Sequence, residues 1–224
     1  MTVINYAVST PALRECDCRL VSRSWERSMA VRILVFYGSY RSDRMGIRLV
    51  DYVVAGLRAR GGDVEFVDAK AIGLPMLDRM YKEYPPGSAP EALESLASKI
   101  RASDAFVFVT GEYNWGMQPG LKNLTDHFLE EWFWRPAAIA SYSAGRIAGA
   151  RSALLWHGTL SEMGMIVISS TLSVGPIALA LTAEGKPIGE AGLSLDRAFP
   201  RFADDLFWWS EAAKMQRARR APPY

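Results

Sequence analysis

The 224-residue chain has only two cysteines and two histidines, and this scarcity excludes several common kinds of site. Cys16 and Cys18 form an isolated pair without the further ligands that a zinc site needs, so we expect two ordinary reduced thiols. His127 and His157 fall in segments with a helical pattern, where a packed or surface side chain is a more common outcome than a catalytic base. The sequence therefore predicts no metal site and no catalytic histidine.

A long apolar run and a signal peptide are also missing. No stretch of about eighteen consecutive apolar residues occurs, and the nearest candidate, residues 165–181, is interrupted by serines, threonine and Pro176. The first 28 residues carry scattered charges and lack the apolar core that an export signal needs. We therefore expect a cytoplasmic protein without a membrane partner.

An excess of charge of one sign is absent as well. The chain has 26 basic and 24 acidic residues, which gives a formal net charge of +2 and a pI near 8.5. Binding to nucleic acid usually needs a strongly basic face, so these values argue against a nucleic-acid partner. A small anionic ligand is compatible with them.

Two well-known nucleotide motifs do not occur. A GxxxxGK[ST] sequence would indicate a P-loop for ATP, and GxGxxG would indicate a dinucleotide-binding Rossmann turn. Asp68 follows the second predicted strand, but without those glycines we expect a strand-end residue rather than a ribose ligand. Neither ATP nor tightly held NAD is therefore the expected ligand.

What the chain does have is a large apolar content and a regular pattern. Half of the residues are hydrophobic, which is enough for one well-buried domain but not for two of comfortable size. We expect this domain to comprise residues 30–217. Residues 1–29 are expected to be a loosely ordered extension, and residues 218–224 a basic tail.

Strand-like and helix-like segments alternate along this domain. Short apolar runs predict strands at 31–37, 63–67, 105–110, 137–142 and 165–169. Apolar residues at helical spacing predict helices from about 44 to 60, around 93–100, and over 119–132, 147–163 and 195–215. This alternation favours a three-layer, doubly wound α/β fold with a five-stranded parallel sheet in the order 2-1-3-4-5, in which ligands lie beyond the carboxyl ends of the strands.

The loop after the first predicted strand, residues 38–46, has the character of a phosphate site. It leads into a helix, and backbone N–H groups at a helix N-terminus attract anions. Ser39 can add a hydroxyl donor, Arg41 and Arg44 can each offer a guanidinium fork, and Gly46 can let the backbone approach a ligand. The alternative for this loop taken alone is a solvated turn whose arginines face water.

The loops after the third and fourth predicted strands can complete a site beside it. Residues 110–123 contain two aromatic residues, an amide, several glycines and a proline near a helix start, which suits a wall for a flat heteroaromatic ring. Residues 141–146 are small and polar, which leaves room for a ligand edge. A structured turn that packs on its own helix is the alternative for the longer loop.

Taken together, the three loops resemble those of the NAD(P)H-dependent FMN reductases, which have the flavodoxin-like fold. The resemblance is carried by GSYRSDRMG at 38–46, GEYNWGMQPGLKN at 111–123 and SYSAGRIAGARSALLWHGTLSEMGM at 141–165, and it extends from about residue 30 to the final helix. The sequence departs from the family pattern at Gly111, where proline is usual, at Arg44 and Gly46, where serine and asparagine are commoner, and at the bulky Trp115.

The resemblance implies an FMN site built from all three loops. The phosphate would be held by Ser39, Arg41, Arg44, Met45 and Gly46, the isoalloxazine would be bordered by Glu112, Tyr113, Asn114 and Trp115, and Ser143, Gly145 and Arg146 would approach the other side of the ring. No side chain would be catalytic, because the reactive centre is N5 of the flavin.

The implied activity is hydride transfer from NADPH or NADH to FMN and then to a small-molecule electron acceptor, such as free flavin, a quinone, an azo compound or a metal ion. Family members are usually homodimers or homotetramers. The aromatic residues 132–134 are candidates for such a contact, with core packing as an equal alternative. A flavodoxin-like electron carrier and a non-catalytic FMN-binding module are the competing functions.

Overall fold

The computed structural model describes residues 30–224. The predicted extension, residues 1–29, lies outside the described residues together with Cys16 and Cys18. None of the helices between residues 30 and 224 is both long enough and apolar enough to cross a membrane. The same part of the chain contains no group of three or more histidine, cysteine or acidic side chains that could hold a metal ion.

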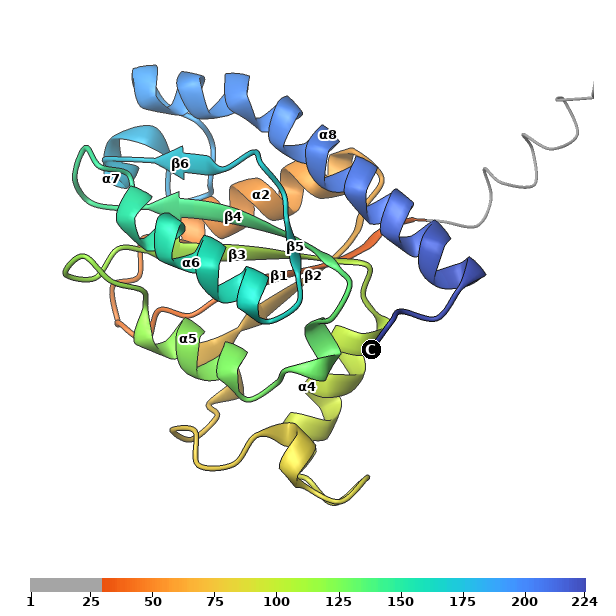
Figure 1. Cartoon of the computed structure of the whole chain (residues 1–224). Helices are drawn as coiled ribbons and strands as arrows, with labels where there is room; N and C mark the ends of the chain where they lie inside the picture. Colours follow the sequence, from red (N-terminus) through yellow and green to blue (C-terminus); the bar gives the residue numbers. More distant parts are fainter. Residues whose placement is uncertain (1–29) are drawn as a thin grey trace, which may run out of the picture. The chain divides into compact units, whose positions relative to one another are not determined.

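A parallel sheet forms the middle layer of the fold (Figure 1). Its strands are β1 (Arg32–Tyr37), β2 (Asp63–Asp68), β3 (Ala105–Gly111), β4 (Pro136–Tyr142), β5 (Ile166–Val167) and β6 (Leu172–Val174). The pairing order is β2-β1-β3-β4-β5, with β6 also paired to β4, and every pairing is parallel. The predicted fold class and strand order are confirmed.

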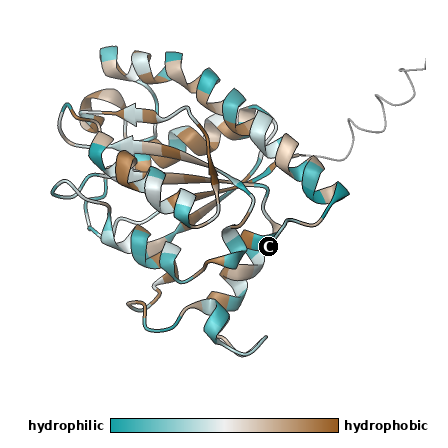
Figure 2. Ribbon diagram, viewed as in Figure 1, coloured by the Kyte–Doolittle hydropathy of each residue, from teal (hydrophilic) through white to brown (hydrophobic). Residues whose placement is uncertain are grey.

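Helices cover both faces of this sheet (Figure 1). They are α2 (Ile47–Ala59), α3 (Ala69–Ile72), α4 (Glu91–Ala102), α5 (Pro119–Asp126), α6 (Ala150–Glu162), α7 (Ile177–Ala180) and α8 (Gly189–Arg219), with 3-10 turns η1 (Tyr81–Glu83) and η2 (Glu130–Trp132). Along β1, Ile33 and Val35 pack in the cluster that includes α2 and α8, whereas Leu34 and Phe36 pack in the cluster that includes α4, α5 and α6. The central strands β1 and β3 are buried on both faces and are almost continuous apolar runs, and Figure 2 shows the middle of the sheet in brown.

The fifth position of the sheet is occupied by two short strands instead of the single strand predicted at 165–169. β5 pairs with the start of β4, at Pro136 and Ala137, and β6 pairs with its end. Between them the Ser169 hydroxyl and the Ser170 N–H both donate to Asp205 on α8, at 3.2 and 3.0 Å. Bonding to α8 takes these serines out of the ladder, so the edge strand is interrupted.

The helix predicted at 119–132 is shorter in the structure and ends at Asp126. The indole N–H of Trp132 donates to the backbone oxygens of Thr125 and Phe128, at 3.2 Å each, which binds the separate turn η2 against the end of α5. Helix ends also differ: α2 begins at Ile47 and not near 44, α6 begins at Ala150 and not at 147, and α8 extends the predicted 195–215 to Gly189–Arg219. The short helices α3 and α7 and the turn η1 were not predicted.

The aromatic residues 132–134 divide between the core and the surface. Trp132 is fully buried, with its ring centroid 4.9 Å from that of Phe106 and 5.4 Å from that of Phe36. Phe133 and Trp134 are partly exposed and pack on Tyr224. Core packing therefore accounts for Trp132.

Candidate functional site

A cleft of about 330 Å³ opens at the carboxyl ends of β1, β3 and β4. These strand ends point toward the left of the view in Figure 1. The lining residues are Ser39, Arg41, Asp43, Arg44, Met45, Gly111, Glu112, Tyr113, Asn114, Tyr142, Ser143, Ala144 and Ile177. The cleft thus lies where the strand order reverses between β1 and β3, which is the usual ligand position in such sheets.

Eight of the twelve residues predicted for the site line this cleft. They are Ser39, Arg41, Arg44, Met45, Glu112, Tyr113, Asn114 and Ser143. The other four, Gly46, Trp115, Gly145 and Arg146, do not line it. Topology explains the agreement, because parallel strands bring the loops at their carboxyl ends to one edge of the sheet.

The loop after β1 presents unused hydrogen-bond donors at the start of α2. Within the described residues, none of the backbone N–H groups from Arg41 to Gly46 donates a hydrogen bond to the protein. Helix α2 has no side-chain cap and no acidic residue in its first turn. The guanidinium of Arg41 has no partner in the described residues either. Unpaired N–H groups beside a free guanidinium are the donors that a phosphate requires.

Arg44 in the same loop is bound within the protein. Its Nη1 and Nη2 lie 2.7 and 2.6 Å from the two carboxylate oxygens of Asp68, and this hydrogen bonding raises the pKa of Arg44. Asp68 also accepts from the N–H of Lys70 and caps α3. Asp68 therefore lies at the end of β2, as expected. Its carboxylate binds the Arg44 guanidinium that the sequence assigned to phosphate binding.

Gly46 and Gly111 leave room for a tyrosine. A Cβ atom at Gly46 would lie 2.2 Å from Cζ of Tyr142, and one at Gly111 would lie 2.8 Å from the same atom. The space that a side chain at Gly46 would fill holds the Tyr142 ring, and the part of the Gly46 backbone in phosphate binding stays a prediction. The glycines at positions 46 and 111, which depart from the family pattern, therefore both leave space for the Tyr142 ring.

The loop after β3 is fastened to α6 by Arg151. The Arg151 guanidinium donates to Oε1 of Glu112 at 2.7 Å, and the Arg151 N–H donates to Oε2 at 3.2 Å. Cζ of Arg151 also lies 3.9 Å from the centre of the Trp115 ring, and Trp115 is 67% exposed. Trp115 therefore packs on Arg151 and does not line the cleft, and its contact with the isoalloxazine stays a prediction.

Of the three residues predicted for the site on the loop after β4, Ser143 lines the cleft. Its hydroxyl donates to the backbone oxygen of Gly145 at 2.8 Å. Gly145 and Arg146 are exposed and belong to the turn beyond it. Only the first part of this loop reaches the cleft.

Comparison with known proteins identifies the relatives of this chain. Residues 31–178 match the family described as NADPH-dependent FMN reductase. The chain belongs to this family. The predicted resemblance is confirmed.

Two curated members of the FMN reductase family show how far the similarity extends. An NAD(P)H-dependent FMN reductase of Schizosaccharomyces pombe is 37% identical over 120 residues, which are 50% of this chain and 57% of that protein. One from Pseudomonas aeruginosa is 33% identical over 126 residues, 54% of this chain and 65% of that protein. The chain thus covers less than two thirds of the length of either relative.

A solved structure agrees over more of the fold. FerB, a flavoenzyme NAD(P)H:(acceptor) oxidoreductase from Paracoccus denitrificans, is 25% identical, with a TM-score of 0.62. The superposition covers 79% of this chain and 97% of FerB. The likeness to FerB therefore extends over most of the described domain.

Sequence reasoning missed Tyr142, which lies in the cleft of this family member. Tyr142 ends β4, and its oxygen is 3.0 Å from the hydroxyl of Tyr37 and 2.8 Å from Nε2 of Gln118. Burial raises the pKa of both tyrosines above the ordinary value of 10.0. Their phenols therefore stay protonated at neutral pH. The position of Tyr142 at the carboxyl edge was readable from the predicted strand, but its partners were not.

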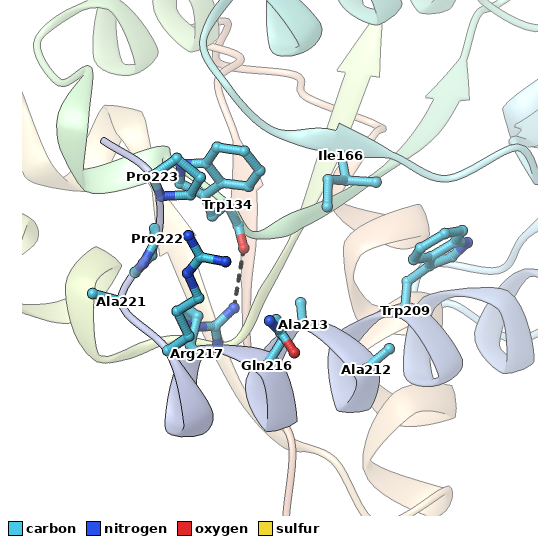
Figure 3. A pocket seen from close by; sticks show the side chains of 11 residues that line it. Trp134, Ile166, Trp209, Ala212, Ala213, Gln216, Arg217, Ala221, Pro222 and Pro223 are labelled. Atoms are coloured by element: carbon cyan, nitrogen blue, oxygen red, sulfur yellow. Dashed lines mark hydrogen bonds between the residues drawn. The ribbon is translucent and has the colours of Figure 1, made fainter.

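A second cavity lies near the start of β4, at the opposite end of the strand from the cleft (Figure 3). It has a volume of about 390 Å³, and the side chains of Trp134, Ile166 and Trp209 line it. Ile166 pairs with Pro136 at the start of β4, whereas the first cleft lies at the end of that strand. Arg217 in its wall donates to the Trp134 backbone oxygen at 3.1 Å and to Asp104 at 3.1 Å. No predicted site residue belongs to this cavity.

Proposed function

We propose that the protein is an FMN-dependent NAD(P)H oxidoreductase that binds FMN in the cleft beyond β1, β3 and β4. The observation that carries this proposal is the meeting of eight predicted cofactor residues in one cleft, beside an uncapped helix terminus. Its electron donor would be NADPH or NADH. Its acceptor would be a small molecule: free flavin, a quinone, an azo compound or a metal ion. Membership of the FMN reductase family supports the proposal.

The residues of the cleft fit FMN at the phosphate end. The backbone N–H groups from Arg41 to Gly46 and the guanidinium of Arg41 would bind the phosphate, since none of them has a partner among the described residues. Ser39 is almost fully buried, and its hydroxyl is bonded to Tyr113 at 2.9 Å, so it would act through that tyrosine.

At the ring end, the chain would orient the cofactor and exclude water. Tyr113 and Asn114 would border one side, Ser143 would approach the other, and Met45 and Ile177 would supply apolar contact. Bound FMN would supply the redox chemistry, by accepting a hydride from NAD(P)H at N5 and returning the electrons to the acceptor. The protein needs no acid–base pair for this reaction, and its task is alignment of two flat rings.

The proposal extends to assembly and location. We infer a homodimer or homotetramer in the cytoplasm, as the resemblance implies. Exposed apolar side chains on the outer helices, such as Leu154 and Trp208, at 73% and 63%, are consistent with contact between copies. Light scattering of the purified protein would give the oligomeric state, and a monomer at micromolar concentration would contradict it.

The test of the function uses the full chain and both nucleotides. We expect purified protein to bind FMN with a visible flavin spectrum, and either NADPH or NADH to bleach that spectrum without oxygen. Adding free FMN or a quinone should then restore the oxidised spectrum. FMN-loaded protein that neither nucleotide bleaches would identify an electron carrier or a binding module. Protein that does not bind FMN would overturn the assignment of the cleft.

A further inference from the structure

The cavity of Figure 3 is elongated and follows one face of α8. Trp209, Ala213 and Gln216 all line it, and their spacing of four and three residues places them on the same face over about two turns of the helix. Figure 3 shows Trp209 at one end of the cavity and Trp134 with Pro223 at the other. The shape therefore suits an extended ligand better than a compact one.

The walls of this cavity combine apolar surface with positive charge. Trp134, Ile166 and Trp209 supply large apolar side chains. Of the eleven described residues that line it, two are arginines, one is Gln216, and none is acidic. Its volume of about 390 Å³ lies within the range of small-molecule sites, about 300 to 1,000 Å³. A ligand that matches these walls has an apolar body and a negative charge.

The two arginines of the wall differ in what they can still bind. Arg217 is bound to Asp104 and to the Trp134 backbone oxygen, at 3.1 Å each. The Arg220 guanidinium and the Gln216 side-chain amide have no partner within residues 30–224. A free guanidinium beside an amide suits a carboxylate. The negative end of the α8 dipole amounts to only about half a charge, so the unpaired charge of Arg220 outweighs it.

Trp134 is held in this wall at a cost in free energy. Its φ angle is 61°, in the left-handed region that bulky residues rarely adopt. The Trp134 N–H donates to Gly164 at 3.0 Å and its backbone oxygen accepts from Arg217, which fix this conformation. The indole N–H is buried and has no hydrogen-bond partner among the described residues. Such costs are typical of ligand-binding walls rather than of ordinary core packing.

We propose that this cavity binds a monocarboxylate with an extended apolar chain, which is the chemistry of a fatty acid. The apolar chain lies along α8 between Trp209 and Ile166, and the carboxylate accepts hydrogen bonds from Arg220 and Gln216. No residue of this cavity lines the cleft beyond β1, β3 and β4. The second site thus goes beyond the proposed FMN-dependent activity and does not depend on it.

Calorimetric titration of the full chain with decanoate and with decanol tests the ligand class. We expect saturable binding of one decanoate per chain. Decanol should bind about tenfold more weakly or less, because it keeps the apolar chain but loses the charge-assisted bonds. Absence of saturable decanoate binding would overturn the site. Equal binding of the two compounds would overturn the role of the carboxylate.

A pair of neighbouring arginines locates the charged end of the ligand. Arg220→Gln should weaken decanoate binding about three- to tenfold and leave decanol binding unchanged. The matched control is Arg219→Gln, which makes the same change of charge at a residue that does not line the cavity. It should change the affinity less than twofold. Equal effects of the two substitutions would show an effect of overall charge and would contradict contact with Arg220.

Ala213→Phe locates the apolar end, because the new ring would occupy part of the cavity beside Trp209. It should abolish binding of decanoate and decanol alike, and wild-type affinity in this variant would overturn the placement. If Ala213→Phe does not fold, the two arginine variants still decide.

Titration in the presence of FMN separates the two sites. We expect FMN-loaded protein to bind decanoate as tightly as FMN-free protein does, because the cavity and the cleft share no lining residue. Competition between FMN and decanoate would place decanoate in the cleft and overturn the proposal. A protein that binds decanoate but not FMN would instead contradict the proposed function and leave this inference standing.

Discussion

At the scale of single residues, the two arginines of the loop after β1 differ in what they can still bind. Arg44 makes two bonds to the carboxylate of Asp68, at 2.6 and 2.7 Å. Arg41 lines the cleft with a guanidinium that has no partner in the described part of the chain. Because a compensated charge attracts an anion less than a free one, phosphate binding should depend mainly on Arg41.

Replacing Arg41 by alanine should weaken FMN binding by about 1.5 to 3 kcal/mol, because a charge-assisted bond to phosphate is lost. Quenching of flavin fluorescence during titration with protein measures the dissociation constant. Arg197→Ala is the matched control, since Arg197 lies on α8, away from the cleft, and pairs with the exposed Glu190. An unchanged affinity in Arg41→Ala would show that the loop after β1 does not hold the phosphate.

Gly46→Ala should destabilise the protein by about 1 to 3 kcal/mol, because the new methyl group would overlap the Tyr142 ring. Backbone strain does not contribute, since Gly46 has φ −64° and ψ −13°, which alanine adopts readily. Gly158→Ala on α6 is the control: a Cβ there meets nothing within 4 Å, so it should stabilise by about 0.5 to 1 kcal/mol. Urea unfolding measures both values, and equal effects of the two substitutions would contradict the steric explanation.

At the scale of elements, the loop after β3 depends on α6 for its shape. Asn114 and Trp115 both have positive φ angles, 48° and 74°, which side chains other than glycine adopt at a cost. The Tyr113 and Gly116 backbones close the turn with reciprocal bonds of 3.0 and 2.8 Å. Arg151 adds the contacts to Glu112 and Trp115 that attach this turn to the helix.

Arg151→Met should loosen the turn at residues 113–116, although methionine keeps a side chain of similar length on α6. It removes the ion pair to Glu112 and the contact with the Trp115 ring, and we expect FMN binding to weaken by about 0.5 to 2 kcal/mol. Hydrogen exchange of the amides from Asn114 to Gly116 should become faster. Arg197→Met serves as control, and an unchanged exchange rate in Arg151→Met would show that the turn holds its shape alone.

The elements also show what the sequence could and could not predict. The strands were readable because burial on both faces requires continuous apolar runs, and their alternation with helices then placed the three loops at one edge. The split of the last strand depends on Asp205, some 36 residues beyond Ser169. Likewise, the loss of the Arg44 fork depends on Asp68 at the end of another strand. Such partners are set by tertiary contact and leave no local pattern.

At the scale of the whole molecule, the two ends of the sheet are built differently. The carboxyl end carries the cleft, where the N–H groups from Arg41 to Gly46 and the Arg41 guanidinium have no partner within residues 30–224. The amino end is closed by Asp104, which precedes β3 and is 7% exposed. Its carboxylate accepts from the Arg32 N–H at 3.0 Å, from Lys214 at 2.8 Å and from Arg217 at 3.1 Å. Within the described residues, the donors at the carboxyl end are therefore available to a ligand, whereas those around Asp104 at the amino end are bonded within the protein.

Asp104→Asn should therefore destabilise the protein far more than a surface substitution of the same kind. The amide keeps the shape but loses the charge that faces Lys214 and Arg217 at the end of α8, and breaking a buried pair from one side costs about 3 to 5 kcal/mol. Burial already lowers the pKa of Arg217, so its charge is poorly solvated without Asp104. The control is Asp204→Asn, because Asp204 is 68% exposed and pairs with Arg60 at the surface, where a loss below about 1 kcal/mol is expected. Urea unfolding compares the two variants, and FMN affinity should remain at the wild-type value in both, since neither residue lines the cleft. A small loss of stability in Asp104→Asn would show that the end of α8 is held by its apolar contacts alone.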